Sequence, residues 1–189
     1  MILGFSTNVC GRTATLFAER GYRVVVVSPS DIEAETYPSY VIIKADLAEP
    51  SSVKDIFDRT RREVGEPNVV LYYGQRFPFN ETLRRMRENP SAAAFRANPP
   101  DHILNIGLDS YTTALSINAI SPYLAAQQAV EGFTRITNGG PTTFLYMGHI
   151  APWELVKPAH WTLCASQSAV AHMITAAAES YRAQRYKYD

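Results

Sequence analysis

The sequence predicts an α/β fold in which strands and helices alternate around one parallel sheet, and three observations carry that prediction. An apolar start at 1–3 leads into a glycine turn, an unbroken β-branched run occupies 23–28, and amphipathic stretches separate the later apolar runs. Unbroken apolar runs are typical of strands that are buried on both faces of a parallel sheet. Alternation of such strands with helices favours right-handed crossovers. We therefore expect a Rossmann-like, doubly wound parallel sheet in a single domain over 1–189.

Each element of the first half follows from a local pattern. A helical apolar face through 14–18 ends at Gly21, a residue typical of helix ends. Between 50 and 64, apolar residues recur at helical spacing and predict a second helix. The strands expected in this half lie at 1–3, 23–28, 40–43 and 68–72.

The second half is expected to contain two long helices with a strand between them. The polar, proline-rich stretch 76–101 is interpreted as a functional loop or an insertion around a short helix at 80–88. Helices are expected at about 108–136 and at about 160–185, the second rich in alanine. The strand between them is expected at 141–147.

Composition and charge exclude several classes of partner. Lys+Arg and Asp+Glu both number 18, so the net charge is zero and the basic stripe of a nucleic-acid-binding protein is missing. No stretch approaches the roughly 20 apolar residues that cross a bilayer, and no secretory signal is visible. Two widely spaced cysteines, Cys10 and Cys164, form neither a disulfide framework nor a metal motif. These features favour a reduced, cytoplasmic protein without a metal site.

Landmarks in the order and spacing of a known family run along nearly the whole chain, from 1 to 185. They are the glycine turn that begins at Gly4, and then Ala45–Leu47, Val69–Tyr72, Ser116–Ala119 and Ala165–Val170. In these the chain resembles the short-chain dehydrogenase/reductase superfamily, in particular an atypical branch that is common in fungi and often found in secondary metabolism. The resemblance implies a dinucleotide site at the carboxyl ends of the strands. Family members usually continue well beyond the position of Arg185, so a sheet shortened at its C-terminal side is expected.

The residues that would hold a nicotinamide dinucleotide depart from the family pattern. The positions of the three turn glycines hold Gly4, Asn8 and Cys10, although Asn8 can adopt a positive φ and cap a helix. Ser28, after the second strand, offers neither the acid that holds a ribose diol nor the arginine that holds a 2′-phosphate. Tyr73 stands where the family's cofactor-lining Asn-Ala-Gly begins. We expect weak NAD(P) binding or none, at a vestigial site formed by Gly4, Asn8, Ser28 and Asp46.

The four catalytic positions that the resemblance implies hold Asn118, His149, Leu163 and Gln167. In the family a tyrosine donates the proton, a lysine lowers its pKa and a serine orients the carbonyl. Leucine cannot donate a proton, and glutamine carries no charge to lower a neighbour's pKa. His149, expected at the end of the fifth strand, titrates near neutrality. We expect His149 to carry out acid–base chemistry together with Asn118 and Gln167. The alternatives are that His149 is a loop histidine hydrogen-bonded to the backbone and that Asn118 has a structural role.

The expected substrate pocket is lined by Tyr73, Trp153, Trp161, Leu163 and Cys164. Tyr72 is a further candidate for the aromatic wall of this pocket, although aromatic residues near strand ends are at least as often plain core. For Cys164, a role as a small buried hydrophobic residue is favoured over a role as a nucleophile. The sequence favours a non-redox enzyme of the isomerase, cyclase or dehydratase type that acts on a small natural product. Two alternatives stay open: a non-catalytic protein that binds a nucleotide or a partner, and an NAD(P)-dependent reductase with rearranged catalytic groups.

Self-association is expected as well. The resemblance implies a homo-oligomer, because the family commonly pairs the two long helices that are expected here at 108–136 and 160–185. Their alanine-rich faces suit close packing, and a net charge near zero is permissive of association.

Overall fold

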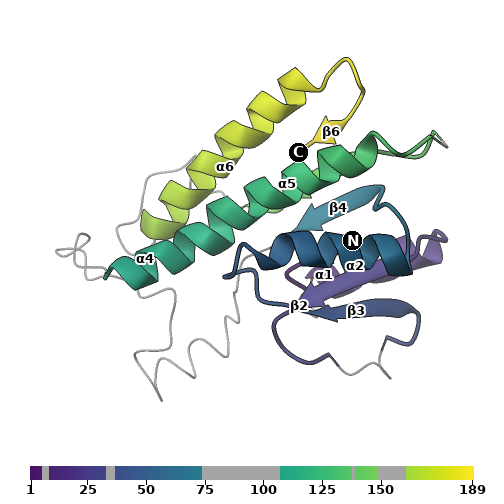
Figure 1. Ribbon diagram of the computed structural model, residues 1–189, viewed down its shortest axis with the longest axis horizontal. Helices are drawn as coiled ribbons and strands as arrows, with labels where there is room; N and C mark the ends of the chain where they lie inside the picture. Colours follow the sequence, from purple (N-terminus) through teal and green to yellow (C-terminus); the bar gives the residue numbers. More distant parts are fainter. Residues whose placement is uncertain (6–8, 33–36, 74–106, 138, 149–160) are drawn as a thin grey trace.

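A computed structural model describes the chain except residues 6–8, 33–36, 74–106, 138 and 149–160 (Figure 1). Within the described ranges the chain forms a six-stranded sheet in the order β3-β2-β1-β4-β5-β6, and every neighbouring pair of strands is parallel. The strands are β1 (Ile2–Leu3), β2 (Val24–Ser28), β3 (Tyr40–Lys44), β4 (Val69–Tyr72), β5 (Thr143–Tyr146) and β6 (Lys187–Tyr188). The predicted Rossmann-like parallel sheet is therefore confirmed.

One face of the sheet is covered by the helices that connect β3 to β6. They are α2 (Ser52–Glu63), α4 (Leu108–Leu115), η3 (Ser116–Ile120), α5 (Ser121–Phe133) and α6 (Trp161–Ser180). Figure 1 shows α2, the continuous rod from α4 to α5, and α6 in front of the strands. Alternate strand residues point to this face. Among them Leu3, Val27 and Tyr72 join Phe57 and Phe133 in the larger of two buried clusters.

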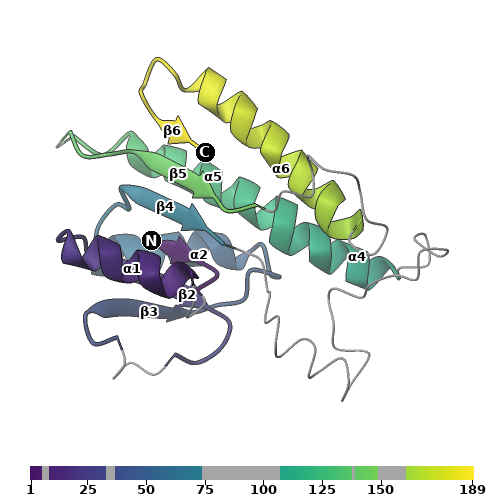
Figure 2. The ribbon, with the colours of Figure 1, turned by 180° about the vertical axis from the view of Figure 1, so that it is seen from behind.

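The other face carries α1 (Val9–Glu19), which Figure 2 shows in front of the strands. Here the intervening strand residues Ile2, Val26 and Leu71 pack with Cys10 and Ala14 of the helix. Because side chains are packed against both faces of the sheet at β2, that strand is buried along its whole length. The unbroken β-branched run predicted this arrangement.

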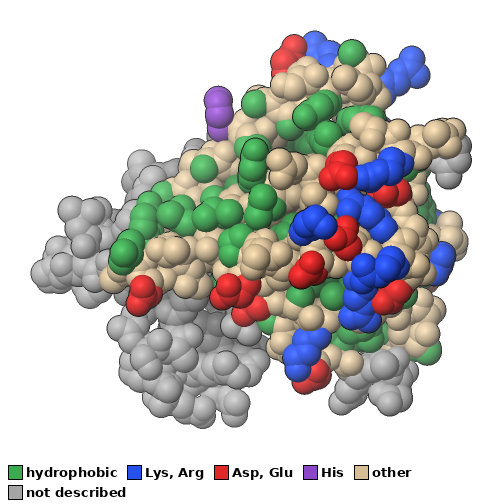
Figure 3. All heavy atoms as spheres, in the orientation of Figure 1, with side chains coloured by type: hydrophobic (Ala, Val, Ile, Leu, Met, Phe, Trp, Pro, Cys, Tyr) green, Lys and Arg blue, Asp and Glu red, His purple; other side chains and the backbone are tan. Residues whose placement is uncertain are grey.

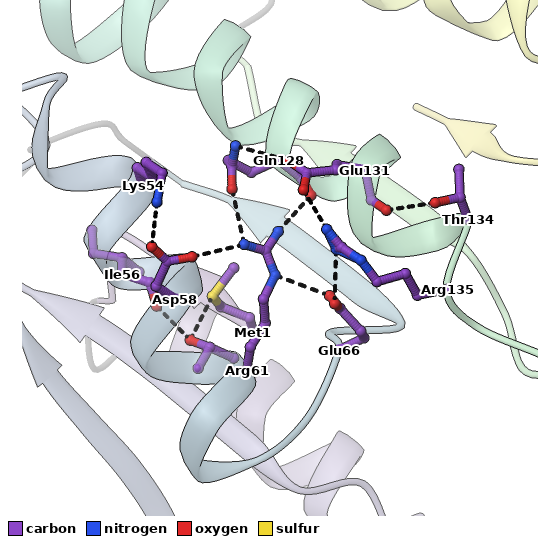
Figure 4. A network of polar contacts seen from close by, with 11 residues as sticks. Met1, Lys54, Ile56, Asp58, Arg61, Glu66, Gln128, Glu131, Thr134 and Arg135 are labelled. Atoms are coloured by element: carbon purple, nitrogen blue, oxygen red, sulfur yellow. Dashed lines mark hydrogen bonds and ion pairs between the residues drawn. The ribbon is translucent and has the colours of Figure 1, made fainter.

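A network of charged and polar side chains joins α2 to the C-terminal part of α5 (Figure 4). Arg61 of α2 donates to Asp58 at 3.0 Å and to Glu66 at 3.2 Å. It also donates to the side-chain and backbone oxygens of Gln128 on α5, at 3.1 and 3.2 Å. Arg135, just after α5, donates to the second oxygen of Glu66 at 3.1 Å. The network therefore joins two helices that are distant in the sequence.

Two predictions about the long helices need correction. The helix expected at 108–136 is present but contains the π-helix η3 at its centre. The helix expected at 160–185 ends at Ser180, and the chain turns through Arg185, whose φ is 60°, to return as β6. β6 pairs with β5 and buries Tyr188, but its two-residue pattern is too short to predict a strand. The short helix expected at 80–88 lies outside the described residues.

Within the described ranges, none of the helices combines the length and the apolar character that crossing a membrane requires.

Candidate functional site at the carboxyl ends of the strands

The strand order reverses between β1 and β4. In open parallel sheets, ligands bind outside the carboxyl ends of the strands at such a switch point, in what is called the crevice. The backbone there is held by Val27, whose carbonyl accepts from the N–H groups of Gly4 and Phe5 at 3.0 and 2.7 Å. The N–H of Tyr73, directly after β4, donates to Leu3 O at 2.7 Å. These bonds bring the ends of β1, β2 and β4 to one edge.

Three side chains and one glycine form the described part of this crevice: Gly4, Phe5, Cys10 and Tyr73. Gly4 has a φ of 86°, a conformation that favours glycine, and its carbonyl lies 3.9 Å from the Cys10 sulfur as a thiol acceptor. Tyr73 packs on the buried cluster that contains Phe5 and Cys10, and it stays partly exposed. Burial raises the pKa of Tyr73, and the neighbouring thiol acts in the same direction. Hereafter "the crevice" means these four residues.

The polar side chains that follow β2 and β3 form hydrogen bonds within the turns in which they lie. The hydroxyl of Ser28 is buried and accepts from the N–H of Ser30 at 3.2 Å. One carboxylate oxygen of Asp46 accepts from the N–H of Ala48 at 2.9 Å, which is a local turn of the kind Asp favours. Lys44, at the end of β3, binds both carboxylate oxygens of Asp31, at 2.8 and 2.9 Å. These polar side chains are therefore engaged in contacts within or between their own turns.

A second group of polar side chains lies beside the π-helix on the helix-covered face. Tyr72 and Tyr146 are partners across β4 and β5, and their rings stack with centroids 5.9 Å apart. The Tyr72 hydroxyl donates to Ile117 O at 2.6 Å, and the Tyr146 hydroxyl donates to Asn118 O at 3.3 Å. A π-helix changes the ordinary hydrogen-bond pattern of an α-helix and is frequent at functional sites. Both tyrosines thus bind carbonyls of η3.

Burial raises the pKa of both hydroxyls, that of Tyr72 well above its ordinary value. For Tyr146, a hydrogen bond with the Gln167 side chain acts in the opposite direction. Gln167 lies on α6 and is 1% exposed, so the contact is part of the core. We call Tyr72, Tyr146, Asn118 and Gln167 the tyrosine cluster.

Asn118 is buried in this cluster, and the hydrogen bonding of its side chain is incomplete among the described residues. Its side chain is 2% exposed, and its amide nitrogen donates to Ala114 O at 3.0 Å. Its side-chain oxygen has no partner among the described residues. Because most buried polar groups are paired, such an acceptor calls for an explanation. A structural role for the amide nitrogen and a binding role for the oxygen are both compatible with this geometry.

The structure places the other predicted site residues on α6 or outside the described part. Leu163 and Cys164 are buried, and burial raises the pKa of the Cys164 thiol, which opposes nucleophilic activation. Trp161 begins α6, but its side chain is not among the described ones. Asn8, His149 and Trp153 lie outside the described residues. The residues described do not gather three or more His, Cys, Asp or Glu side chains into a possible metal site.

Sequence reasoning missed the hydrogen bonding of Tyr72 and Tyr146. From the sequence, Tyr72 is a candidate only for an aromatic wall, and Tyr146 is only a strand residue. The available signal is a tyrosine at the last position of each of two apolar strands. Recognising it requires the register of β4 and β5, which the sequence alone does not supply.

The chain is similar to proteins of known class along its whole length, although no family model matches it. It is 32% identical over 190 residues to the short chain dehydrogenase/reductase dmxR12 of Cryptosporiopsis sp. (strain 8999), a match that covers 100% of this chain and 73% of that protein. It is 26% identical over 161 residues to the chloroplastic NADPH-dependent aldehyde reductase 2 of Arabidopsis thaliana, covering 74% of this chain and 51% of the reductase.

Solved structures with low sequence identity share the fold. The 4-hydroxyisoleucine dehydrogenase complexed with NADH and succinate matches with a TM-score of 0.75 and 12% identity, over 100% of this chain and 73% of the dehydrogenase. A putative oxidoreductase from Escherichia coli str. K-12 matches with a TM-score of 0.74 and 14% identity, over 98% of this chain and 72% of the other. At such identities the likeness concerns the fold alone.

Proposed function

The chain belongs to the short-chain dehydrogenase/reductase superfamily, and from that premise we propose that it acts on a small molecule without hydride transfer. The observation that carries the proposal lies on α6. Leu163 and Gln167 stand at the positions where the resemblance implies the proton-donating tyrosine and its lysine, and each is 1% exposed. Neither side chain ionises, so the family's proton donor and the cation that tunes it are both absent from these positions.

The reaction that we propose is a proton transfer of the isomerase, cyclase or dehydratase type on a small natural product. Such a reaction moves protons, and in a dehydration also releases water, without net oxidation or reduction of the substrate, so it requires no nicotinamide. We assign the acid–base step to His149, because histidine is the side chain whose ordinary pKa lies near neutrality. Asn118 and Gln167 are proposed to orient the substrate beside it.

The proposed pocket combines Tyr73, Trp153, Trp161, Leu163 and Cys164. The contacts in the crevice support weak NAD(P) binding or none, because Ser28 is engaged in its own turn and Tyr73 occupies the switch point. We also propose a cytoplasmic location, which two buried cysteines outside any disulfide support.

Consumption of a reduced nicotinamide tests the proposal directly. The protein is incubated with NADPH or NADH and a panel of aldehydes and quinones, and the absorbance of the dihydronicotinamide is followed. We expect no loss of absorbance above the rate without protein. Turnover that scales with protein concentration would contradict the proposal and favour a reductase with rearranged catalytic groups.

The acid–base assignment has a separate test once a substrate is found. His149→Ala should lower the rate by about 10²–10⁴-fold, the usual contribution of general acid–base catalysis. His149→Gln keeps a hydrogen-bonding group but cannot titrate, so it should lower the rate nearly as much. A fully active Gln variant would leave His149 only an orienting role.

A second candidate function is that of a binding partner, and one surface favours it. Leu108, Ile120 and Tyr123 on the outer side of the rod from α4 to α5 are 76%, 43% and 53% exposed. Figure 3 shows hydrophobic side chains along this rod from its α4 end, and charged side chains gathered near its α5 end. The resemblance implies a homo-oligomer through these helices and α6. Light scattering at tens of micromolar tests it, and a monomer there would contradict it.

A further inference from the structure

A hollow lies at the amino ends of the central strands, at the opposite edge of the sheet from the crevice. Its volume is about 250 Å³, and its lining comes from the ends of α1 and α2 and from the first residues of β1, β2 and β4. A cavity of about 150 Å³ is enough to hold benzene. The hollow therefore has room for a side chain of valine size together with main-chain atoms.

The hollow arises from the unequal lengths of three adjacent strands. Ile2 of β1 pairs with Val26 of β2 and with Leu71 of β4. However, β2 already begins at Val24 and β4 at Val69, so both neighbours of β1 extend further toward the amino edge. Both ribbon views show the start of β1 between these two strands (Figures 1 and 2). Since adjacent strands lie about 4.8 Å apart, β2 and β4 face each other there across the width of one strand.

The two facing strands direct main-chain groups toward the hollow. The Met1 nitrogen donates to Val69 O at 2.8 Å, and Gly4 N–H donates to Val27 O at 3.0 Å. In a strand, the N–H and C=O groups of one residue point to the same side, and alternate residues share that side. The N–H groups of Val69 and Val25 therefore point to the line of β1. An extended main chain placed in this line can accept hydrogen bonds from both strands.

The hollow is apolar where the first side chain of such a segment would lie. Met1 packs on the cluster of the helix-covered face and Ile2 on the cluster of the α1 face. Because strand side chains alternate, the next position in line beyond Met1 points to the α1 face. The lining on that face includes Val24 and the rings of Phe17 and Tyr22, which meet edge to face with centroids 5.1 Å apart. An apolar side chain is therefore expected at this position.

The charged side chains of the lining already have partners. Glu66 accepts from Arg61 at 3.2 Å and from Arg135 at 3.1 Å. Arg23 donates to two backbone carbonyls at the end of α2, at 2.7 and 3.1 Å. Among the described lining residues, these contacts favour an occupant that is held by main-chain hydrogen bonds and apolar packing over one that is held by charge.

We propose that the hollow binds an extended apolar peptide segment of a partner chain, which prolongs the line of β1 between β2 and β4. In binding by strand addition, main-chain hydrogen bonds supply affinity, and pockets for alternate side chains supply specificity. The proposal does not depend on the proposed function, because the hollow and the crevice lie at opposite ends of the strands.

The experiment titrates the full chain with the peptide Lys-Lys-Gly-Val-Val in a calorimeter. We expect saturable binding with a dissociation constant on the order of 1 mM or tighter. The peptide Lys-Lys-Gly-Asp-Asp should bind at least about tenfold more weakly, because its carboxylates would be buried among apolar side chains. Tyr22→Ala removes one ring from the wall of the hollow and should weaken binding of the valine peptide about fivefold.

Tyr123→Ala is the matched control, because Tyr123 is exposed on α5 and does not line the hollow. It should leave the titration unchanged, and circular dichroism should show that every variant is folded. A second measurement places the segment in the same chain, by fusing Gly-Val-Val in front of Met1. This fusion should have a higher Tm than a Gly-Asp-Asp fusion and should bind the free valine peptide at least about tenfold more weakly than the unfused chain.

Four results would each overturn the proposal. They are the absence of saturable binding by the valine peptide, equal binding of the aspartate peptide, wild-type affinity in Tyr22→Ala, and wild-type affinity in the Gly-Val-Val fusion. The proposed function fails on a different result, which is consumption of NADPH or NADH by the wild type.

Discussion

The crevice and the tyrosine cluster lie at the same edge of the sheet, yet their side chains are held in different ways. In the crevice, Tyr73 is partly exposed and packs on the buried cluster that contains Phe5 and Cys10. In the tyrosine cluster, Gln167 is 1% exposed and Tyr72 binds a carbonyl 45 residues away in the sequence. The difference teaches that the partly exposed Tyr73 can be substituted with little repacking of its neighbours. The cluster can be changed only together with the packing of η3 and α6.

The largest effect that would sharpen this comparison is a loss of folding stability at high pH. Burial raises the pKa of Tyr72 and Tyr146 in the folded state, whereas an unfolded tyrosine titrates near pH 10. Their contribution to stability is therefore fully present below about pH 10 and is lost as pH rises further, because only the unfolded chain releases the protons. We expect cooperative alkaline unfolding, in which phenolate absorbance of these residues appears together with loss of circular dichroism. Smooth ionisation of all tyrosines in a chain that stays folded would contradict the core position of the cluster.

A lysine at position 167 should have the next largest effect. Gln167→Lys places an ammonium group at a site that is 1% exposed, and burying an unpaired charge is costly. We expect the free energy of unfolding in urea to fall by about 3 kcal/mol. The matched control is Gln184→Lys, at an exposed position, which should change it by less than about 0.5 kcal/mol. A loss below about 1 kcal/mol at position 167 would show that this part of α6 accepts the family's lysine without repacking.

Adjacent tyrosines provide the closest comparison of the two regions. Tyr72→Phe removes the donor to Ile117 O and leaves a buried carbonyl without its partner. We expect a loss of about 1–2 kcal/mol in the free energy of unfolding. Tyr73→Phe keeps the ring, and the residue is partly exposed, so it should change stability by less than about 0.5 kcal/mol. Equal losses for the two variants, measured by chemical denaturation, would remove the distinction between the cluster and the crevice.

The sequence predicted the parts of this site that depend on local pattern. The β-branched run at β2, the glycine after β1 and the helical position of Asn118 all follow from spacing along the chain, and the structure has them. What could not be predicted depends on distant contacts. The stacking of Tyr72 on Tyr146 requires the register between two strands. Similarly, a π-helix has no simple periodic signature, and the two residues of β6 are too few to predict a strand.

The smallest expected effect concerns the charged network that joins α2 to α5, outside both regions (Figure 4). A Cβ at position 132 would lie 2.6 Å from a carboxylate oxygen of Glu66, so Gly132→Ala must displace that side chain from Arg61 and Arg135. Alanine is a better helix former than glycine by about 1 kcal/mol, which offsets the loss of partly exposed ion pairs. We therefore expect a net change in the free energy of unfolding of less than about 0.5 kcal/mol.

A double-mutant cycle separates these two opposing terms. Arg61→Ala in the wild type should lower the free energy of unfolding by about 1 kcal/mol, because Arg61 also contacts Asp58 and Gln128 and lies over the ring of Phe57. In the Gly132→Ala background the same substitution should cost about 0.5 kcal/mol less, since the contact with Glu66 is already gone. Strict additivity would mean that Glu66 keeps its bond to Arg61 beside the added methyl group, and that the close approach of α5 does not depend on glycine.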